Sequence, residues 1–271
     1  MKLFTQLFLA ISGLLFMQCD EVIHLDLETI PAKLVVDASI DCEKGTAGNT
    51  QTIKLTTTTG YYDDSEGPVV SGATVIVTTS SKTFQFAEVP GTGQYVCTDF
   101  EPTIWETYIL TIGYNGESYT ASETLVSTPE VNRIEQINNG GFDGDEIEVK
   151  VYFRDDGSKE NFYMSNVKAP FIKFPLYTID SDERSQGNEM YLVFGHEDTA
   201  QGDDIAIRLY GISSQYHSYM ARLLEATASG GPFPTIPAAV KGNVVNQTNK
   251  ANYALGYFRL SEVVARNYVV Q

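Results

Sequence analysis

Short runs of alternating apolar and polar residues constrain the fold of this chain more than any other feature. Residues 146–153 have a two-residue period, which places Ile147 and Val149 on one side of an extended strand. Similar runs recur along the chain, and turn-forming residues separate them. One such separator, Asn115-Gly116, is the dipeptide that suits a type I′ hairpin turn. The sequence therefore predicts an all-β protein built of antiparallel β-sandwiches.

A break in this pattern divides the chain into two parts. Residues 126–129 read Val-Ser-Thr-Pro, and further strand-like runs begin after them. We expect an N-terminal β-sandwich domain over residues 32–127 and a C-terminal β-rich domain over residues 128–271. Both are expected to be sandwiches of the immunoglobulin-like or transthyretin-like kind, and one short helix belongs to the second.

That helix is predicted near residues 213–229, where apolar side chains recur at helical spacing. The apolar positions are Tyr216, Tyr219, Met220, Leu223 and Leu224, and this stripe indicates packing on the sandwich and not a cofactor site. Ser213 or Ser214 is the expected N-cap, and Gly230-Gly231 is the expected stop.

The N-terminus has the features of an export signal. A lysine precedes an apolar run that is too short to span a bilayer, and Cys19 closes the run. This arrangement predicts a signal peptide over residues 1–18, lipid attachment to Cys19 and a lipidated tether over residues 19–31. The alternative is an ordinary cleaved signal with an accidental cysteine.

The charge of the chain excludes one class of partner. The formal net charge is −17 at pH 7, so general electrostatics will not bind this chain to nucleic acid or to an anionic lipid surface. The acidity keeps the protein soluble and favours cationic ligands. The simplest explanation of the acids is a solvated surface.

Two cysteines remain after lipidation of the first. Cys42 and Cys97 form an even pair in an oxidising compartment, so they are candidates for a disulfide. The alternative is a pair of buried free thiols, because the sequence does not show whether their β-carbons meet.

Several segments together resemble the DUF4249 lipoproteins of Bacteroidota. The segments are residues 33–38, 60–63, 68–75, 93–95 and 107–112, and, most specifically, residues 232–234, 240–244 and 254–258. The resemblance covers nearly all of the mature chain. It implies a cell-surface lipoprotein, with Asp20 and Glu21 resembling the signal that directs lipoproteins to the outer face of the outer membrane. Members of this family are often encoded beside TonB-dependent receptors, which implies such a receptor as a partner.

Two glycines within the most specific block have structural explanations. Gly242-Asn243 predicts a turn or bulge that needs positive φ. Gly256 is expected to let two backbones approach closely, and the aromatic residues Tyr257 and Phe258 are expected in the core.

The residues that carry chemistry do not form a recognisable catalytic set in the sequence. His24 lies in the tether, His196 is expected in an exposed loop, and His217 falls in the predicted helix. No G-x-S-x-G motif, phosphate-binding loop or cysteine–histidine pairing in a recognisable setting occurs. We therefore expect no enzyme activity and no cofactor.

Three acidic turns offer the oxygen ligands that calcium prefers. The candidates are residues 143–146, 155–157 and 203–204, and none of them has EF-hand spacing. Solvated acids are the expected explanation, so no metal site is predicted.

One loop is a candidate for ligand or partner binding. Tyr61, Tyr62, Asp63 and Asp64 place two aromatic residues beside two acids, which suits stacking on a sugar or gripping another protein. The alternative is a tyrosine pair that anchors the loop.

These observations lead to one main hypothesis and two alternatives. The main hypothesis is a non-catalytic surface lipoprotein of the outer membrane that assists a TonB-dependent transporter in nutrient uptake, by capturing ligand or by shaping the transporter's lid. The first alternative is a free-standing glycan- or peptide-binding module. The second, an envelope hydrolase, is less favoured because the sequence offers no nucleophile with its partners.

Overall fold

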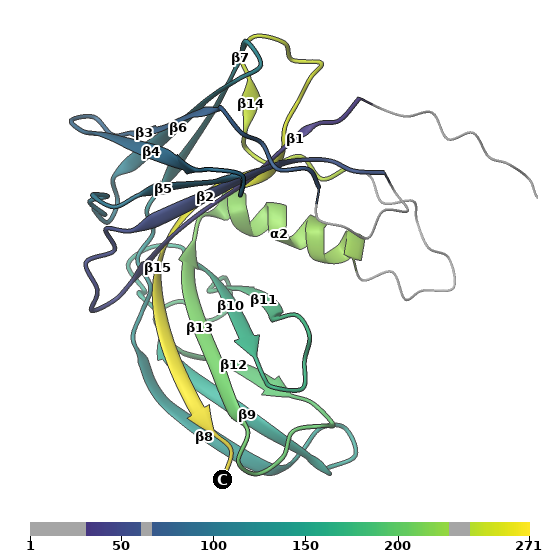
Figure 1. The fold of residues 1–271 in the computed structure, drawn as a ribbon. Helices are drawn as coiled ribbons and strands as arrows, with labels where there is room; N and C mark the ends of the chain where they lie inside the picture. Colours follow the sequence, from purple (N-terminus) through teal and green to yellow (C-terminus); the bar gives the residue numbers. More distant parts are fainter. Residues whose placement is uncertain (1–30, 61–66, 228–238) are drawn as a thin grey trace, which may run out of the picture. The chain divides into compact units, whose positions relative to one another are not determined.

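Strands dominate the structure, a computed structural model that describes residues 31–60, 67–227 and 239–271 (Figure 1). The strands are β1 (Leu34–Glu43), β2 (Gln51–Thr57), β3 (Thr74–Thr78), β4 (Thr83–Val89), β5 (Gln94–Cys97), β6 (Thr107–Tyr114), β7 (Glu117–Thr124), β8 (Val131–Gly140), β9 (Glu146–Arg154), β10 (Phe162–Lys168), β11 (Leu176–Ser181), β12 (Glu189–Gly195), β13 (Asp204–Ile212), β14 (Val245–Asn246) and β15 (Leu255–Val269). One helix, α2 (Ser214–Thr227), accompanies them in this part of the chain. The prediction of a β-rich protein with a helix in its second half is confirmed.

The hairpin predicted at Asn115-Gly116 joins β6 to β7. Asn115 has a φ of 50° and Gly116 a φ of 75°, and Tyr114 pairs with Glu117 across the turn. A type I′ turn requires positive φ at both central residues, so this local prediction is confirmed.

The N-terminal core lies between two layers of strands. One layer contains β1, β2 and β5, and the other contains β3, β6, β7 and β14. Strand β4 belongs to both layers, because residues 83–86 pair with β3 and residues 87–89 pair with β5. Alternate side chains such as Val36, Leu55 and Leu110 point inward and are fully buried, as the two-residue period requires.

A tyrosine ties one corner of this sandwich to its own backbone. The Tyr108 hydroxyl donates to the carbonyl of Glu101 at 3.0 Å and accepts from the Thr103 amide at 2.8 Å. The Tyr108 ring stacks on Phe100, with the ring centroids 5.3 Å apart. Immunoglobulin-type sandwiches use a tyrosine in this way, with the hydroxyl bonded to backbone a few residues upstream.

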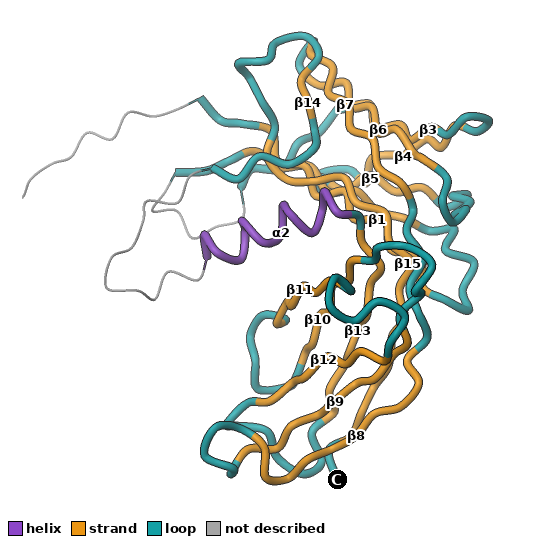
Figure 2. Tube along the Cα trace, turned by 180° about the vertical axis from the view of Figure 1, so that it is seen from behind, coloured by secondary structure: helices purple, strands orange, loops and turns teal. Residues whose placement is uncertain are grey.

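The C-terminal half has apolar side chains on both faces of its central strands. On one face of β10 and β13, the three-stranded sheet β12-β9-β8 packs to form the C-terminal core, which includes Val149, Val151 and Ile207. On the other face lies α2, drawn purple in Figure 2, whose buried residues Tyr216 and Met220 pack there. The predicted packing of the helix stripe is therefore confirmed.

Helix α2 begins at the predicted cap. The Ser213 side-chain oxygen accepts a hydrogen bond from the Tyr216 amide at 3.1 Å, so Ser213 and not Ser214 is the N-cap. The helix ends at Thr227, and the stop predicted at Gly230-Gly231 lies outside the described residues.

Strand β15 connects the two halves of the sheet. Its first part runs parallel to β1, with Val35 opposite Leu255 and Glu43 opposite Val263. Its second part runs antiparallel to β13, with Tyr210 opposite Val263. The result is a twelve-stranded sheet in which β15 separates the strands of the two halves.

The structure departs from the expected division between residues 127 and 128. Val244, Ala254, Phe258 and Leu260 come from the C-terminal end of the chain but are buried in the N-terminal core. Residues 32–271 form one compact unit. The physical reason is that β1 needs a partner on its second edge, and the last strand of the chain supplies it.

The two glycines of the C-terminal block allow this close packing. Gly256 has a φ of 86°, and a β-carbon there would lie 2.0 Å from the Val36 carbonyl oxygen, so the predicted close approach is confirmed. A β-carbon on Gly242 would lie 1.7 Å from the Gly256 carbonyl oxygen. The positive φ predicted at Gly242-Asn243 is wrong, since neither residue has one, and close contact is the actual constraint.

Candidate functional site

Several predicted site residues lie outside the described part of the chain. They are Cys19, Asp20, Glu21 and His24 in the N-terminal segment, and Tyr61, Tyr62, Asp63 and Asp64 in the loop after β2. Lipidation, surface export and ligand binding by these residues therefore stay predictions.

The two remaining cysteines are free thiols. Cys42 on β1 and Cys97 on β5 are both buried, which is the second of the two alternatives that the sequence left open. Burial raises the pKa of Cys42 to about 12 and that of Cys97 to about 11. Both groups therefore stay protonated at neutral pH and are poor nucleophiles.

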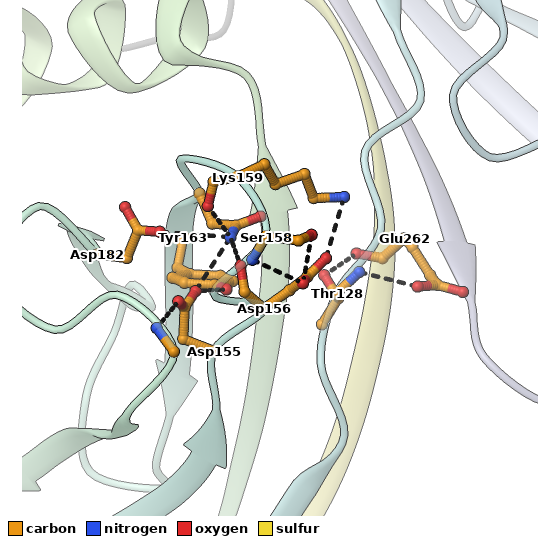
Figure 3. Close-up of polar contacts among 10 residues, drawn as sticks. Thr128, Asp155, Asp156, Ser158, Lys159, Tyr163, Asp182 and Glu262 are labelled. Atoms are coloured by element: carbon orange, nitrogen blue, oxygen red, sulfur yellow. Dashed lines mark hydrogen bonds and ion pairs between the residues drawn. The ribbon is translucent and has the colours of Figure 1, made fainter.

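One acid of these turns, Asp155, is buried, contrary to the expectation of a solvated surface, while its neighbour Asp156 is exposed. The Asp155 carboxylate accepts hydrogen bonds from the Tyr163 hydroxyl at 2.5 Å, from the Gly187 amide at 2.7 Å and from the Asn161 side-chain amide at 3.2 Å (Figure 3). Asp182 is also buried, and the same Asn161 nitrogen lies 3.4 Å from it. This cluster ties the end of β9 to β10 and to the turn before β12. The other tested acids, at residues 143–146 and 203–204, are exposed or half-buried.

No metal site is found among residues 31–60, 67–227 and 239–271, where no three histidine, cysteine or acidic side chains are arranged to hold an ion. The two histidines in these ranges lie in aromatic surroundings. His196 is 5.0 Å from the Phe171 ring centroid, and His217 on α2 is 5.1 Å from that of Phe162. Burial lowers the pKa of His217.

The outer face of the three-stranded sheet brings aromatic and charged side chains together at the surface. We define this outer face as Arg133 and Glu135 on β8, Lys150 and Tyr152 on β9, and Glu189, Tyr191 and Val193 on β12. The register places Arg133, Tyr152 and Tyr191 opposite one another across the three strands. Lys150 stands opposite Glu135 and Val193 in the next row.

The rings and charges of the outer face hold one another in place. The Arg133 guanidinium lies 3.7 Å from the Tyr152 ring centroid, and its Nε donates to Glu135 at 2.8 Å while Nη1 pairs with Glu189. The Tyr152 and Tyr191 ring centroids are 5.3 Å apart. Each exposed pair contributes little to stability, because solvent screens the charges. The network instead fixes the orientation of side chains that solvent can reach.

This arrangement is suited to non-covalent recognition. Tyr191 is 50% exposed and Val193 is 46% exposed, so an apolar surface is presented within a charged frame. Tyrosine and arginine are the residues that most often dominate binding energy at protein interfaces, because they combine large contact area with directed hydrogen bonds. The outer face is our candidate functional site.

The sequence predicted only the residues that β9 contributes to this face. The alternation over residues 146–153 placed Ile147, Val149 and Val151 inward, so Lys150 and Tyr152 had to point outward. The alignment of Tyr152 with Arg133 and Tyr191 depends on strand register, which includes a shift between Val131 and Arg133. That register is not encoded in any local pattern.

The chain belongs to the DUF4249 family, because the family model described as "Domain of unknown function (DUF4249)" matches residues 20–267. This confirms the family prediction made from the sequence motifs. A search of curated proteins finds no match. Among the described residues no helix is both long and apolar enough to cross a membrane.

The solved structures that match this chain have low structural similarity to it. The FN1–FN3 domains of chicken CNTN1 match with a TM-score of 0.27 and 12% identity, over 65% of this chain and 59% of that one. The adhesin InvE of Yersinia pseudotuberculosis matches with a TM-score of 0.22 and 17% identity, over 66% of this chain and 55% of that one. A two-domain fibronectin type III segment of chicken tenascin has a TM-score of 0.21 and 10% identity, over 66% and 90% of the two chains.

Proposed function

We propose that this protein is a non-catalytic lipoprotein on the surface of the outer membrane, anchored through Cys19, and an accessory partner of a TonB-dependent transporter. The main support for the proposal is the outer face of the three-stranded sheet, because its ordered tyrosines and charged side chains are suited to non-covalent binding. The N-terminal segment supports the location, and the family resemblance supports the transporter partner.

A second candidate is a free-standing glycan- or peptide-binding module. The half-exposed ring of Tyr191 favours it, because exposed aromatic rings stack on sugars and on peptide side chains. In this case the same outer face would bind the ligand directly, without a channel partner.

The proposal retains the expected two sandwich domains in a modified form. We infer two β-sandwich halves that share β15, with the N-terminal half nearer in sequence to the anchor and the C-terminal half presenting the outer face. The tyrosine corner at Tyr108 supports the sandwich assignment of the first half.

Copurification from the native outer membrane in mild detergent tests the transporter proposal. The tagged full chain is expected to bring down a β-barrel protein in stoichiometric amount, and the Y152A/Y191A variant is expected to lose it. Y253A is a matched control, since Tyr253 has Lys241 stacked 3.9 Å from its ring centroid but lies outside the outer face.

Three results decide between the candidates. Reproducible absence of a barrel partner with wild-type protein would count against the transporter proposal. Binding of soluble glycans or peptides that is lost in Y152A/Y191A would favour the free-standing module. Equal loss in Y253A would show that the outer face is not the binding surface.

A further inference from the structure

Strand β15 buries polar side chains on the side that faces α2. Phe258 and Leu260 point into the N-terminal core, so the alternate residues Arg259 and Ser261 point the other way, between Tyr257 and Val263. Arg259 is 4% exposed and Ser261 is fully buried. A buried arginine is costly unless its donors are paired, so its surroundings need an explanation.

The Arg259 guanidinium has one acidic partner and two aromatic ones. Its Nη2 donates to the Asp41 carboxylate on β1 at 2.7 Å. Its central carbon lies 5.0 Å from the Tyr210 ring centroid and 5.4 Å from that of Tyr216 on α2. Asp41 is 31% exposed in its side chain, so this ion pair reaches from the buried strand to the surface.

Three buried polar atoms beside this ion pair have no hydrogen-bond partner within the described residues. They are Nε and Nη1 of Arg259 and the side-chain oxygen of Ser261. A buried donor that makes no hydrogen bond costs about 1–3 kcal/mol, and a charged donor costs more. Two neighbouring residues on one strand face therefore present donors that the fold itself does not use.

The groups around these donors are hydroxyls and rings. Tyr216 and Tyr219 come from α2, and Tyr257 comes from β15. The Tyr257 hydroxyl lies 3.3 Å from the buried Glu123 carboxylate, which also accepts from Ser213 at 2.9 Å. These contacts satisfy Glu123 and do not involve Nε or Nη1 of Arg259 or the side-chain oxygen of Ser261.

We propose that Arg259 and Ser261 form a binding site for the carboxylate group of a small organic ligand, with the tyrosine rings beside α2 as its wall. A carboxylate is the planar anion that guanidinium and hydroxyl donors match best, and the rings would pack on an apolar or cyclic ligand body. A doubly charged phosphate fits less well, because Asp41 and Glu123 are already close. The proposal goes beyond the outer-face function and does not depend on it.

Entry to the site requires α2 to move. The helix is fixed at its N-terminus, where its cap Ser213 is bonded to Glu123. Beyond this point its buried contacts are made by Tyr216, Tyr219 and Met220. Tyr216 lies in this capped first turn, so Arg259 is uncovered only if the first turn and the Tyr216 ring move together.

Benzoate and benzamide are the probes, because they share a ring and differ in the carboxylate. Thermal unfolding of the full chain is expected to shift upward with increasing benzoate and to stay unchanged with benzamide, since a ligand that binds only the folded state stabilises it. R259M is expected to weaken benzoate binding about tenfold or more, as the loss of a charge-assisted hydrogen bond predicts. R266M is the matched control, because Arg266 lies on the same strand but is exposed and paired with Glu130.

A measurement on the wild-type protein keeps the test valid if R259M fails to fold. The Nε–H signal of Arg259 in a nitrogen-15 NMR spectrum should shift with benzoate and not with benzamide. S261A should retain the fold and weaken binding several-fold. Three results would overturn the proposal. They are an unchanged Nε–H signal, equal effects of benzoate and benzamide, and evidence that Nε–H donates only to an ordered water.

Discussion

Within the part of the chain that the structure describes, an arginine lies against tyrosine in two places that differ chiefly in burial. On the outer face, Arg133 lies on Tyr152 and pairs with two carboxylates, all reached by solvent. Beneath α2, Arg259 lies near Tyr210 and Tyr216, pairs with one carboxylate and has two unpartnered nitrogens. The same two residue types therefore act differently in the two places. At the surface they are available to bind a partner, and each contact contributes little to stability. In the interior they leave polar atoms without hydrogen-bond partners.

Removing the acidic partner of the buried arginine should have the largest effect. D41N leaves the Arg259 charge buried without a counter-ion, which costs on the order of 3 kcal/mol. The expected result is a lower urea midpoint with an unchanged slope. E189Q, which removes one partner of Arg133, should lower the urea midpoint much less, because both groups are exposed to solvent. Equal effects of the two substitutions would remove the distinction between the two arginines.

Removing a buried hydrogen bond that is not part of an ion pair should have an intermediate effect on stability. Y163F removes the hydroxyl that donates to Asp155 and leaves the ring in place, so we expect a loss of about 1.5–3 kcal/mol. Y152F on the outer face should leave the urea midpoint nearly unchanged, because its hydroxyl is at the surface. Urea unfolding of both variants checks this pair. A small loss of unfolding free energy in Y163F would show that burial alone does not determine how much a contact contributes to stability.

The two regions should also respond to pH with opposite sign. Burial raises the pKa of Glu123, so the folded protein holds this proton at a higher pH than the unfolded chain, and the Glu123 contribution to stability falls as pH rises through that window. Arg133 lowers the pKa of Glu189, so the Glu189 contribution is lost as pH falls. We expect E123Q to change the pH dependence of the unfolding free energy above the ordinary pKa of a glutamate, and E189Q to change it in the opposite direction below that pKa. Slopes of the same sign would contradict the assigned environments.

The smallest effect is expected from removing the exposed arginine. R133M should leave the urea midpoint nearly unchanged, because the ion pairs of Arg133 are screened by solvent. The same variant should weaken partner capture, because the arginine orients Tyr152. Copurification together with urea unfolding checks both statements. A large loss of stability with capture intact would assign Arg133 a structural role.

Local sequence patterns predicted the elements of the fold well. Period-two runs located β9 with its inward Ile147, Val149 and Val151, and Asn115-Gly116 located a hairpin. These features depend on a few neighbouring residues, whose steric and hydrophobic preferences act locally. The helix was found because its apolar stripe and its cap are also local.

Pairing between distant strands could not be predicted in this way. The parallel pairing of β1 with β15 joins residues that are more than 200 positions apart in sequence, such as Val35 and Leu255. The ion pair of Arg259 with Asp41 depends on this long-range pairing, whereas Asp155 is buried by Tyr163 on β10 and by the turn at Gly187. The residues next to an acid in a turn, or next to an arginine in a strand, do not indicate that its side chain is buried. The candidate sites were therefore the part that the sequence could not reveal.

The position of β15 also determines when the edge of β1 can be paired during folding. Until the final residues are available, β1 has an unpaired edge, and such edges invite association with other chains. Pairing across so long a separation is slow, because loop closure precedes the contacts that reward it. A fragment that ends near residue 127 would lack Val244, Phe258 and Leu260 from its interior and would be prone to aggregate. The last strand therefore makes folding of the whole chain conditional on its intact C-terminus.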